Sequence, residues 1–392
     1  MTSPTPISII GAGLSGLVCA RILQLHNVPV TIYELDDSAE ARRQGGSLDI
    51  HDDTGQVALK AAGLWDQARE HAHPSGESMR VMDKHAHVFV DTPEPEGGNG
   101  RPEIDRTVLR QLLIESLAPG TIQWGCKLVR LASDDHGNTL EFANGATVRA
   151  DVVVGADGAW SRVRTALSPE KPAYTGITIT EFRLTDAATK YPESRALVGP
   201  GSVFALSDNK YIGGHGGDHL SLGVGLRVPE DWITATGITG DDPAAARETL
   251  LRELADWAEP LTDLIRHSDD TIWPRPIYAL PIGFTWPRSP RITLIGDAAH
   301  VMSPFAGEGA NLALIDGADL ASELLSHDDP ASGIAAYERR MVPRGAKSAK
   351  ASQKGLERMF NEKAPKQIVS FFRRMNALTR LFRPILRPHG QG

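Results

Sequence analysis

The sequence predicts an α/β fold with a parallel sheet, accompanied by a second, mostly antiparallel sheet and a C-terminal helical segment. Three observations support it: an apolar run at 6–10 enters a helical pattern through a glycine-rich turn, a continuous apolar strand at 151–155 does the same, and residues 174–228 alternate in short glycine-rich runs. Continuous apolar strands are typical of buried parallel sheets, and alternating strands are typical of antiparallel ones.

The first strand, turn and helix have the pattern of a Rossmann-type dinucleotide-binding fold. Gly11 allows a tight turn, Gly13 removes a side chain that would hold a pyrophosphate off the backbone, and Gly16 lets the helix pack on the strand. The helix N-terminus offers N–H groups to the phosphates. A second apolar run, 28–33, ends at Glu34, the acidic residue that ribose hydroxyls need. A glycine-rich turn without a ligand is the weaker alternative.

The next segment is expected to hold helices at 54–70 and 104–117, the second capped by Asp105. One or two strands are expected at 79–90. Residues 123–148 are expected to form a small antiparallel meander, because an Asn-Gly pair there is a strong hairpin signal.

The second half is expected to begin with an antiparallel sheet and to return to the parallel one. A buried strand at 291–295 leads into Gly296-Asp297, and an apolar helix is expected at 309–325. Residues 335–386 are mostly helical and basic, with an apolar inward face and the bases on the other face. The expected domains are a dinucleotide-binding domain at 1–172 and 272–336, a substrate-binding domain at 173–271, and a C-terminal helical segment at 337–392.

Length, charge and cysteine content restrict the number of domains, the partners and the compartment of the protein. The 392 residues suffice for one large or two ordinary domains, and the formal charge of −8 argues against nucleic acid as a partner. Cys19 and Cys126 lie far apart and are expected to be reduced, as in a cytoplasmic protein. The N-terminal stretch has no basic region, and the apolar run behind it is too short to span a membrane. We therefore expect a cytoplasmic monomer without a membrane partner.

Three stretches are expected at the carboxyl ends of parallel strands, the edge where such sheets bind ligands. They are the GxGxxG turn, Asp157-Gly158, and Gly296-Asp297 with its continuation Pro304-Phe305-Ala306-Gly307-Glu308-Gly309-Ala310-Asn311. Their order resembles the flavin-dependent aromatic hydroxylases, the group A monooxygenases related to p-hydroxybenzoate hydroxylase, which hold FAD with GxGxxG, DG and GD motifs. The resemblance covers nearly the whole chain.

Residues 40–42, 46–51, 55–56, 102–106 and 302–307 resemble, within that group, the TetX-type tetracycline-inactivating monooxygenases. The resemblance implies that Glu34 binds the adenosine ribose, that Asp49 and Arg106 bind FAD, that Asp297 binds the ribityl chain or pyrophosphate, and that Arg42 guides NADPH. For Arg110, cofactor binding and a solvated surface position both remain open. The expected cofactor-binding residues are Gly11, Gly13, Gly16, Glu34, Arg42, Asp49, Arg106, Arg110, Asp157, Asp297, Pro304, Gly307, Gly309, Ala310 and Asn311.

The resemblance also implies a mechanism in which the flavin carries the chemistry and the chain supplies no catalytic residue. NADPH would reduce FAD, the reduced flavin would react with O2, and a C4a-hydroperoxyflavin would transfer oxygen to an electron-rich carbon. The backbone of 304–309 and the following helix N-terminus would stabilise negative charge on the reduced flavin. No metal-ligand spacing or Ser/His/Asp set is found, and His300 is expected to be a structural residue beneath the flavin loop rather than a base.

The substrate residues depart from the TetX pattern, whose Gln, Arg and His have no match that we can place. The expected substrate is an aromatic, phenolic or polycyclic compound. The residues expected to line its pocket are Glu181, Phe204, His215 and Phe305. Each phenylalanine could instead be plain core, and His215 could serve only its turn. Tetracycline inactivation, and with it antibiotic resistance, is one candidate role.

Two other functions remain as alternatives: an FAD-dependent alkene reductase of the geranylgeranyl reductase type, and a flavoprotein that sequesters a drug without turnover. A flavin-dependent halogenase is disfavoured because the sequence has no Trp-x-Trp-x-Ile-Pro stretch. A group B monooxygenase or a disulfide reductase is disfavoured because a second GxGxxG and a redox cysteine pair are both missing.

Overall fold

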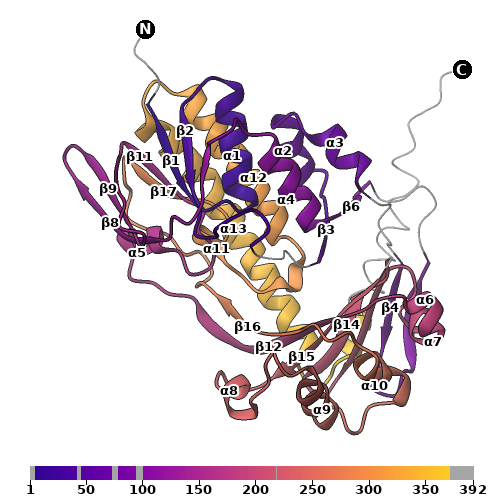
Figure 1. The fold of residues 1–392 in the computed structure, drawn as a ribbon. Coiled ribbons are helices and arrows are strands. Elements are labelled where there is room, and N and C mark those ends of the chain that lie inside the picture. The colour runs from indigo at the N-terminus through magenta and orange to yellow at the C-terminus, as the bar shows by residue number, and fades with distance from the viewer. Residues whose placement is uncertain (1–4, 42–45, 73–77, 94–99, 218, 371–392) are drawn as a thin grey trace, which may run out of the picture. The chain divides into compact units, whose positions relative to one another are not determined.

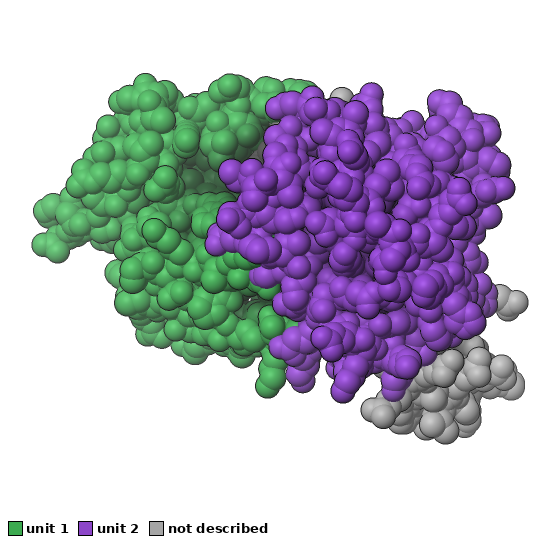
Figure 2. All heavy atoms as spheres, turned by 90° about the horizontal axis from the view of Figure 1, so that it is seen from below, with its two compact units in different colours: residues 1–75, 99–175, 278–353 green, residues 76–98, 176–277, 354–392 purple. Residues whose placement is uncertain are grey.

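The computed structural model in Figure 1 describes residues 5–41, 46–72, 78–93, 100–217 and 219–370. The chain forms two compact units, which have different colours in Figure 2. Unit 1 comprises residues 1–75, 99–175 and 278–353, and unit 2 comprises residues 76–98, 176–277 and 354–392.

Unit 1 is built on a parallel sheet of five strands in the order β17-β11-β1-β2-β7. The strands are β1 (Ile7–Ile10), β2 (Val30–Tyr33), β7 (Ile122–Gln123), β11 (Val152–Gly155) and β17 (Ile292–Leu294). Every residue of β1, β11 and β17 is buried, as expected for parallel strands covered on both faces. Ile10 pairs with Gly155 and with Tyr33, so these strands end together at one carboxyl edge.

Helices of unit 1 follow most of these strands. They are α1 (Leu14–Leu25), α2 (Gly55–Ala61), α3 (Trp65–Glu70), α4 (Arg106–Glu115), α5 (Arg162–Leu167), α11 (Asp297–His300), the 3-10 turn η1 (Pro304–Ala306), α12 (Gly309–Ser326) and most of α13 (Pro330–Met359). The helix expected at 54–70 is in fact two, interrupted at 62–64. Asp105 caps α4 as expected, because its carboxylate accepts the Thr107 N–H at 2.7 Å.

Two smaller sheets complete unit 1. The expected meander is present as β8 (Leu128–Asp134), β9 (Gly137–Phe142) and β10 (Thr147–Ala150), in the order β10-β9-β8. A two-stranded antiparallel pair joins β3 (Ser47–Asp49) to β6 (Glu103–Asp105). This pair holds the start of α4 close to residue 46, whose carbonyl oxygen accepts the Arg106 N–H at 3.1 Å.

Unit 2 is built on a seven-stranded sheet in the order β16-β12-β15-β14-β13-β4-β5. The strands are β4 (Met79–Met82), β5 (Val88–Thr92), β12 (Ala173–Leu184), β13 (Ser202–Ser207), β14 (Lys210–His215), β15 (Leu220–Arg227) and β16 (Ile272–Ala279). Its helices are α6 (Ala187–Lys190), α7 (Pro192–Val198), α8 (Trp232–Thr236), α9 (Pro243–Glu253) and α10 (Glu259–Arg266). The β4–β13 pairing is parallel, whereas the pairings of β12, β13, β14 and β15 with one another are antiparallel.

One face of this sheet forms the core of unit 2. Phe182, Ile212 and Val224 point from it into a buried cluster that also contains Leu250 of α9 and Leu261 of α10. The opposite face carries the residues that alternate with these. The predicted fold class, a parallel α/β sheet with a mostly antiparallel second sheet and C-terminal helix, is confirmed.

The two units differ from the expected domains in several places. The hairpin of β4 and β5 belongs to unit 2, because β4 pairs with β13 more than a hundred residues later in the chain. Residues 337–353 belong to unit 1, because α13 begins there at Pro330, and the helix passes into unit 2 at residue 354. The expected boundaries at 173 and 272 lie at 176 and 278 instead. A long-range strand pairing leaves no local signal in the sequence, which is why the first difference could not be foreseen.

The expected exposed face of bases on the C-terminal helix is wrong for Arg344, whose side chain is only 25% exposed, whereas Arg340 is exposed as expected. Arg344 pairs with Asp316 and Asp319 of α12, and Arg340 pairs with Asp319 and Glu323. The reason is that α12 presents carboxylates, not only apolar side chains, to α13.

Candidate cofactor and substrate sites

The glycine turn after β1 has the shape that a pyrophosphate needs. Gly11 has φ +105°, and a side chain there would overlap the carbonyl oxygen of Ala156. A Cβ added at Gly13, by contrast, would have Ala156 O as its nearest atom at 3.8 Å, so the space beside this residue is open. Gly13 is also the N-cap of α1 and brings no capping side chain to the first N–H groups of that helix. Open space and helical N–H donors therefore coincide at one point of the carboxyl edge.

Glu34 lies at the end of β2, beside this turn. Its carboxylate accepts the Ala12 N–H at 2.5 Å and the Asp36 N–H at 3.0 Å, and the residue is 2% exposed. Arg110 lies behind the same turn, where its guanidinium donates to the carbonyl oxygens of Ala12 at 3.1 Å and Ala39 at 2.8 Å. The structure thus places Arg110 among the backbone that supports the turn, and it places the Glu34 carboxylate next to the space at Gly13.

Asp157, the acid of the second motif, caps α5. Its carboxylate accepts the Ser161 hydroxyl at 2.5 Å and the N–H groups of Arg162 and Val163 at 2.7 and 3.2 Å. Burial outweighs these hydrogen bonds and raises the pKa of Asp157 above its ordinary value. The hydrogen bonds of this carboxylate therefore hold the turn after β11 in place.

Asp297, the acid of the third motif, has a contrasting environment. It follows Gly296, which has φ +61° and no room for a side chain because a Cβ would lie 2.9 Å from Ser15 Oγ. The Asp297 side chain is exposed, and it makes no hydrogen bond to any other residue that the structure describes. A carboxylate presented in this way can accept hydrogen bonds from ligand hydroxyls.

Asn311 fastens the start of α12 to the strand β3. Its amide donates to the carbonyl oxygen of Asp49 at 2.8 Å and accepts the His51 N–H at 2.9 Å. The Asp49 carboxylate accepts a hydrogen bond from His51 Nε2 at 2.8 Å. Although burial raises the pKa of Asp49, the hydrogen bond and charge of His51 outweigh it and lower that pKa below its ordinary value. Sequence reasoning missed His51 as the partner of Asp49, and no local pattern marks it.

The loop before α12 has open space beside two of its glycines. Pro304 begins η1, Phe305 is half-buried, and a Cβ at Gly307 or Gly309 would meet no atom within 4 Å. No side chain caps α12, so the N–H groups of Gly309 and Ala310 at its N-terminus are available to an electronegative edge. Arg42, expected near this cofactor, lies outside the described residues.

These features fit FAD: open space at helical N–H groups, an acid at the end of β2, and an exposed acid after β17. They all lie in unit 1, along the carboxyl edge of one parallel sheet. Residues 4–352 match the family model of the FAD binding domain. The chain belongs to this family.

Relatives with established names place the chain among the monooxygenases. It is 30% identical over 428 residues to monooxygenase asqM of Emericella nidulans, covering 91% of this chain and 96% of that protein. It is 30% identical over 352 residues to 3-amino-4-hydroxybenzoate 2-monooxygenase PtmB3 of Streptomyces platensis, covering 86% and 84%. The protein is therefore an FAD-dependent monooxygenase.

The fold matches solved structures over its full length. The crystal structure of tetracycline destructase Tet(55) is similar with a TM-score of 0.74 at 20% identity, and the match covers 100% of both chains. This likeness confirms the expected resemblance to TetX-like enzymes at the level of the fold.

Three of the four expected substrate residues share one face of the sheet in unit 2. Phe204 of β13 lies opposite Gly213, Gly213 lies opposite Gly223, and Gly223 lies opposite Glu181. Residues directly opposite each other share a face, so this row crosses four strands on the side away from α9 and α10. His215 lies two residues beyond Gly213 on the same face, with its Nδ1 3.3 Å from the hydroxyl of a neighbouring serine. Phe305, the fourth, belongs to unit 1.

Glu181 pairs with Arg275 of β16 at 3.0 Å, and the two side chains are 42% and 60% exposed. Sequence reasoning missed Tyr211, which lies on the same face. Side chains at Gly213 and Gly225 would collide with its ring, and Phe360 packs edge-on against it with ring centroids 5.6 Å apart. The alternating glycines of β15 were the sequence signal for this large neighbour.

The described residues contain no group of three or more His, Cys, Asp or Glu side chains that could hold a metal ion. Among the described helices, none is long and apolar enough to cross a membrane.

Proposed function

We propose that this monooxygenase inserts one oxygen atom of O2 into an aromatic, phenolic or polycyclic small molecule, with NADPH as the electron donor. When bound, FAD supplies the redox chemistry, accepting hydride and activating O2. The main support for this substrate class is the row of opposed residues from Phe204 to Glu181, which offers an aromatic surface and a hydrogen-bond acceptor on one face of the sheet.

The residues of unit 1 hold the cofactor in this proposal. The N–H groups of α1 beside Gly13 bind the pyrophosphate, Glu34 binds the adenosine ribose, and Asp297 binds hydroxyls of the ribityl chain. The N-terminus of α12 at Gly309 stabilises negative charge on the ring system. Arg42 binds NADPH through its phosphates, as the TetX resemblance implies.

The sheet of unit 2 binds the substrate. Three strand spacings separate Phe204 from Glu181, about 14 Å in all, and the ring of Tyr211 covers part of the span. A flat molecule with a hydroxyl or amino group at one end suits this arrangement, because an ionised carboxylate only accepts hydrogen bonds. PtmB3 is named for an amino-hydroxybenzoate and Tet(55) for tetracycline, and both compounds are ring systems with such donors.

The test is NADPH oxidation and oxygen uptake by the FAD-loaded protein, alone and with a panel of aminophenols, hydroxybenzoates, polycyclic quinones and tetracyclines. We expect one class to accelerate NADPH oxidation and to gain one oxygen atom by mass spectrometry. A compound that gains two hydrogen atoms and no oxygen would instead identify an alkene reductase. Tight binding without flavin reduction would identify a sequestering flavoprotein.

A further inference from the structure

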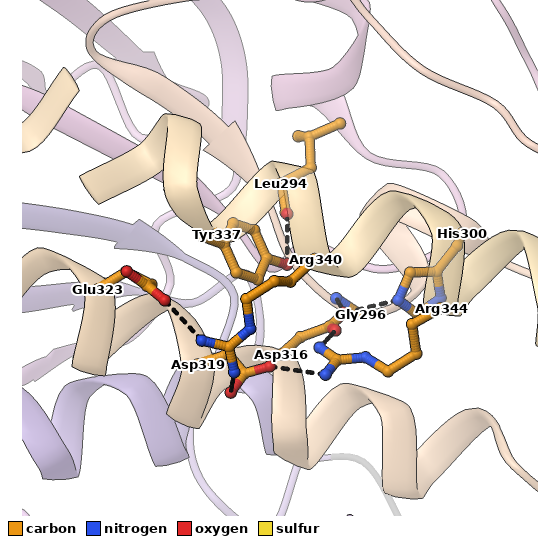
Figure 3. Close-up of polar contacts among 9 residues, drawn as sticks. All are labelled: Leu294, Gly296, His300, Asp316, Asp319, Glu323, Tyr337, Arg340 and Arg344. Atoms are coloured by element: carbon orange, nitrogen blue, oxygen red, sulfur yellow. Dashed lines mark hydrogen bonds and ion pairs between the residues drawn. The ribbon is translucent and has the colours of Figure 1, made fainter. Parts of the chain in front are cut away.

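We propose that His300, Asp316 and Arg344 form a charged clamp that positions the Gly296-Asp297 turn for FAD, and that the clamp works with the His300 imidazole protonated. The proposal rests on the cofactor role proposed above for Asp297. Figure 3 shows these residues and their neighbours, all from unit 1.

A single carboxylate oxygen ties together both ends of α11. Asp316 Oδ2 accepts the Gly296 N–H at 3.0 Å, and it lies 2.5 Å from His300 Nε2. Gly296 precedes α11 and His300 is its last residue, so this oxygen fixes the short helix on which Asp297 stands. Asp316 is fully buried, which leaves the carboxylate dependent on these protein donors.

The other oxygen of the same carboxylate is held by α13. Arg344 Nη2 donates to Asp316 Oδ1 at 2.9 Å, and its Nη1 donates to Asp319 at 2.6 Å (Figure 3). The next residue, Gly345, leaves room for the imidazole, because a Cβ there would lie 3.1 Å from His300 Cδ2. His300 is thereby confined between α12 and α13.

Helix α13 holds the same segment on either side of the clamp. Before it, the Tyr337 hydroxyl donates to the carbonyl oxygen of Leu294 at 3.1 Å. After it, the hydroxyls of Ser303 and Ser352 lie 2.6 Å apart, both buried. The segment from Leu294 to Ser303 is therefore held by α13 at both ends, and the clamp holds its middle, next to Asp297.

The charges around the imidazole favour its protonated form. Asp316 of α12 and Asp297 of α11 face it with negative charge, Arg344 of α13 pairs with Asp316, and Arg164 of α5 donates to the carbonyl oxygen of Ala298 at 2.9 Å. In the wider cluster, Asp319 and Glu323 pair with Arg340, Arg344 and His327, and the buried Asp316 carboxylate is held by Arg344 and His300 together.

The direction of the His300 pKa agrees with the negative charges of Asp316 and Asp297. Burial lowers that pKa, but the charge and hydrogen bond of Asp316 and the charge of Asp297 outweigh it and raise the pKa above 6.5. A raised pKa in the folded state means that the clamp's stabilisation is complete below pH 6.5 and is lost as the pH rises through the folded-state pKa. Binding of FAD is expected to follow the same trend.

The test titrates apoprotein with FAD by flavin fluorescence between about pH 6 and pH 9. We expect His300→Gln, which keeps an N–H donor but not the charge, to weaken FAD binding about tenfold at the acidic end. We also expect the dissociation constant of the unaltered protein to rise across the range and that of His300→Gln to stay constant. Arg344→Lys should weaken binding less than Arg344→Gln, because a single charged donor is retained.

Arg340→Gln is the matched control. Arg340 lies one turn from Arg344 on α13, but it pairs with Asp319 and Glu323, is 56% exposed and does not touch Asp316. It should leave the FAD dissociation constant within about twofold. Thermal melting of each apoprotein verifies folding.

The proposal is overturned if folded His300→Gln binds FAD with the affinity and pH profile of the unaltered protein, or if Arg340→Gln weakens binding as much as Arg344→Gln. Asp297→Ala is measured alongside to separate the two levels of inference. Normal FAD binding by Asp297→Ala would overturn the cofactor role of Asp297, whereas weakened binding by Asp297→Ala together with unaltered binding by His300→Gln would overturn the clamp alone.

Discussion

At the carboxyl edge of the unit 1 sheet, backbone N–H groups are the main donors open to a ligand, and side chains such as Asp157 and Asn311 hold that backbone in place. On the face of the unit 2 sheet away from α9 and α10, the groups offered are side chains, those of Phe204 and Glu181 among them. Glycines also serve the two regions differently: in unit 1 Gly11 lets the turn pack on Ala156 and Gly13 leaves space beside the helix N-terminus, and in unit 2 glycines make room for Tyr211. A backbone site demands particular residues at fixed spacings, whereas a side-chain site can change without altering the sheet.

The largest effect expected from breaking the backbone site is at Gly11. We expect Gly11→Ala to lower the free energy of unfolding by about 2 kcal/mol or more, because φ is +105° and the added methyl would collide with Ala156. Chemical denaturation of the apoprotein measures this. Gly13→Ala is the matched variant, since φ is −80° there and the nearest atom is 3.8 Å away.

Gly13→Ala should fold with nearly unchanged stability and bind FAD about a hundredfold more weakly, because its methyl occupies the space next to the α1 N–H groups. Fluorescence titration with FAD measures this loss. Equal behaviour of the two variants, in either stability or FAD binding, would remove the distinction drawn between the two glycines.

Asp297→Ala tests the exposed side chain of the edge. We expect a folded protein whose FAD affinity falls about thirtyfold, because a charged acceptor for ligand hydroxyls is lost and no described residue depends on it as a hydrogen-bond partner. Absorbance at the flavin band after gel filtration reports retained FAD. Full retention of the yellow colour would contradict the role of Asp297, and Asp157→Ala, which removes a helix cap, should by contrast lower the melting temperature.

The sequence alone predicted the parallel sheet, the three motif turns and their common edge, because glycines and acids at the ends of apolar runs have few other uses. It did not predict the clamp. An aspartate at 316 among the apolar residues of the first half of α12 was a signal of a buried charge, but its partners His300 and Arg344 come from other elements. It also did not predict that β4 joins unit 2, or that Tyr211 fills the glycine-rich face, since both depend on long-range contacts.

Arg42→Ala tests a residue that only the resemblance to the TetX group supports. We expect the KM for NADPH to rise about tenfold with unchanged FAD content, because a guanidinium on a phosphate contributes one charged hydrogen-bonded contact. Steady-state kinetics at varied NADPH, with Arg69→Ala of the exposed helix α3 as the control, make the measurement. An unchanged KM would exclude Arg42 from the NADPH site.

Glu181→Gln gives the smallest expected effect and addresses the side-chain region directly. The amide keeps the size of the carboxylate but weakens its acceptance from a substrate hydroxyl or amine, so kcat/KM for the best substrate should fall about fivefold while FAD affinity stays the same. Stability should barely change, because the pair with Arg275 is exposed on both sides. Glu141→Gln is the matched control, since Glu141 forms a similar exposed cross-strand pair with Arg130 at 2.8 Å in the meander of unit 1. If the two variants have the same kcat/KM, Glu181 is a surface ion-pair residue that does not contact the substrate. The proposed substrate class would then rest on Phe204 and its neighbours alone.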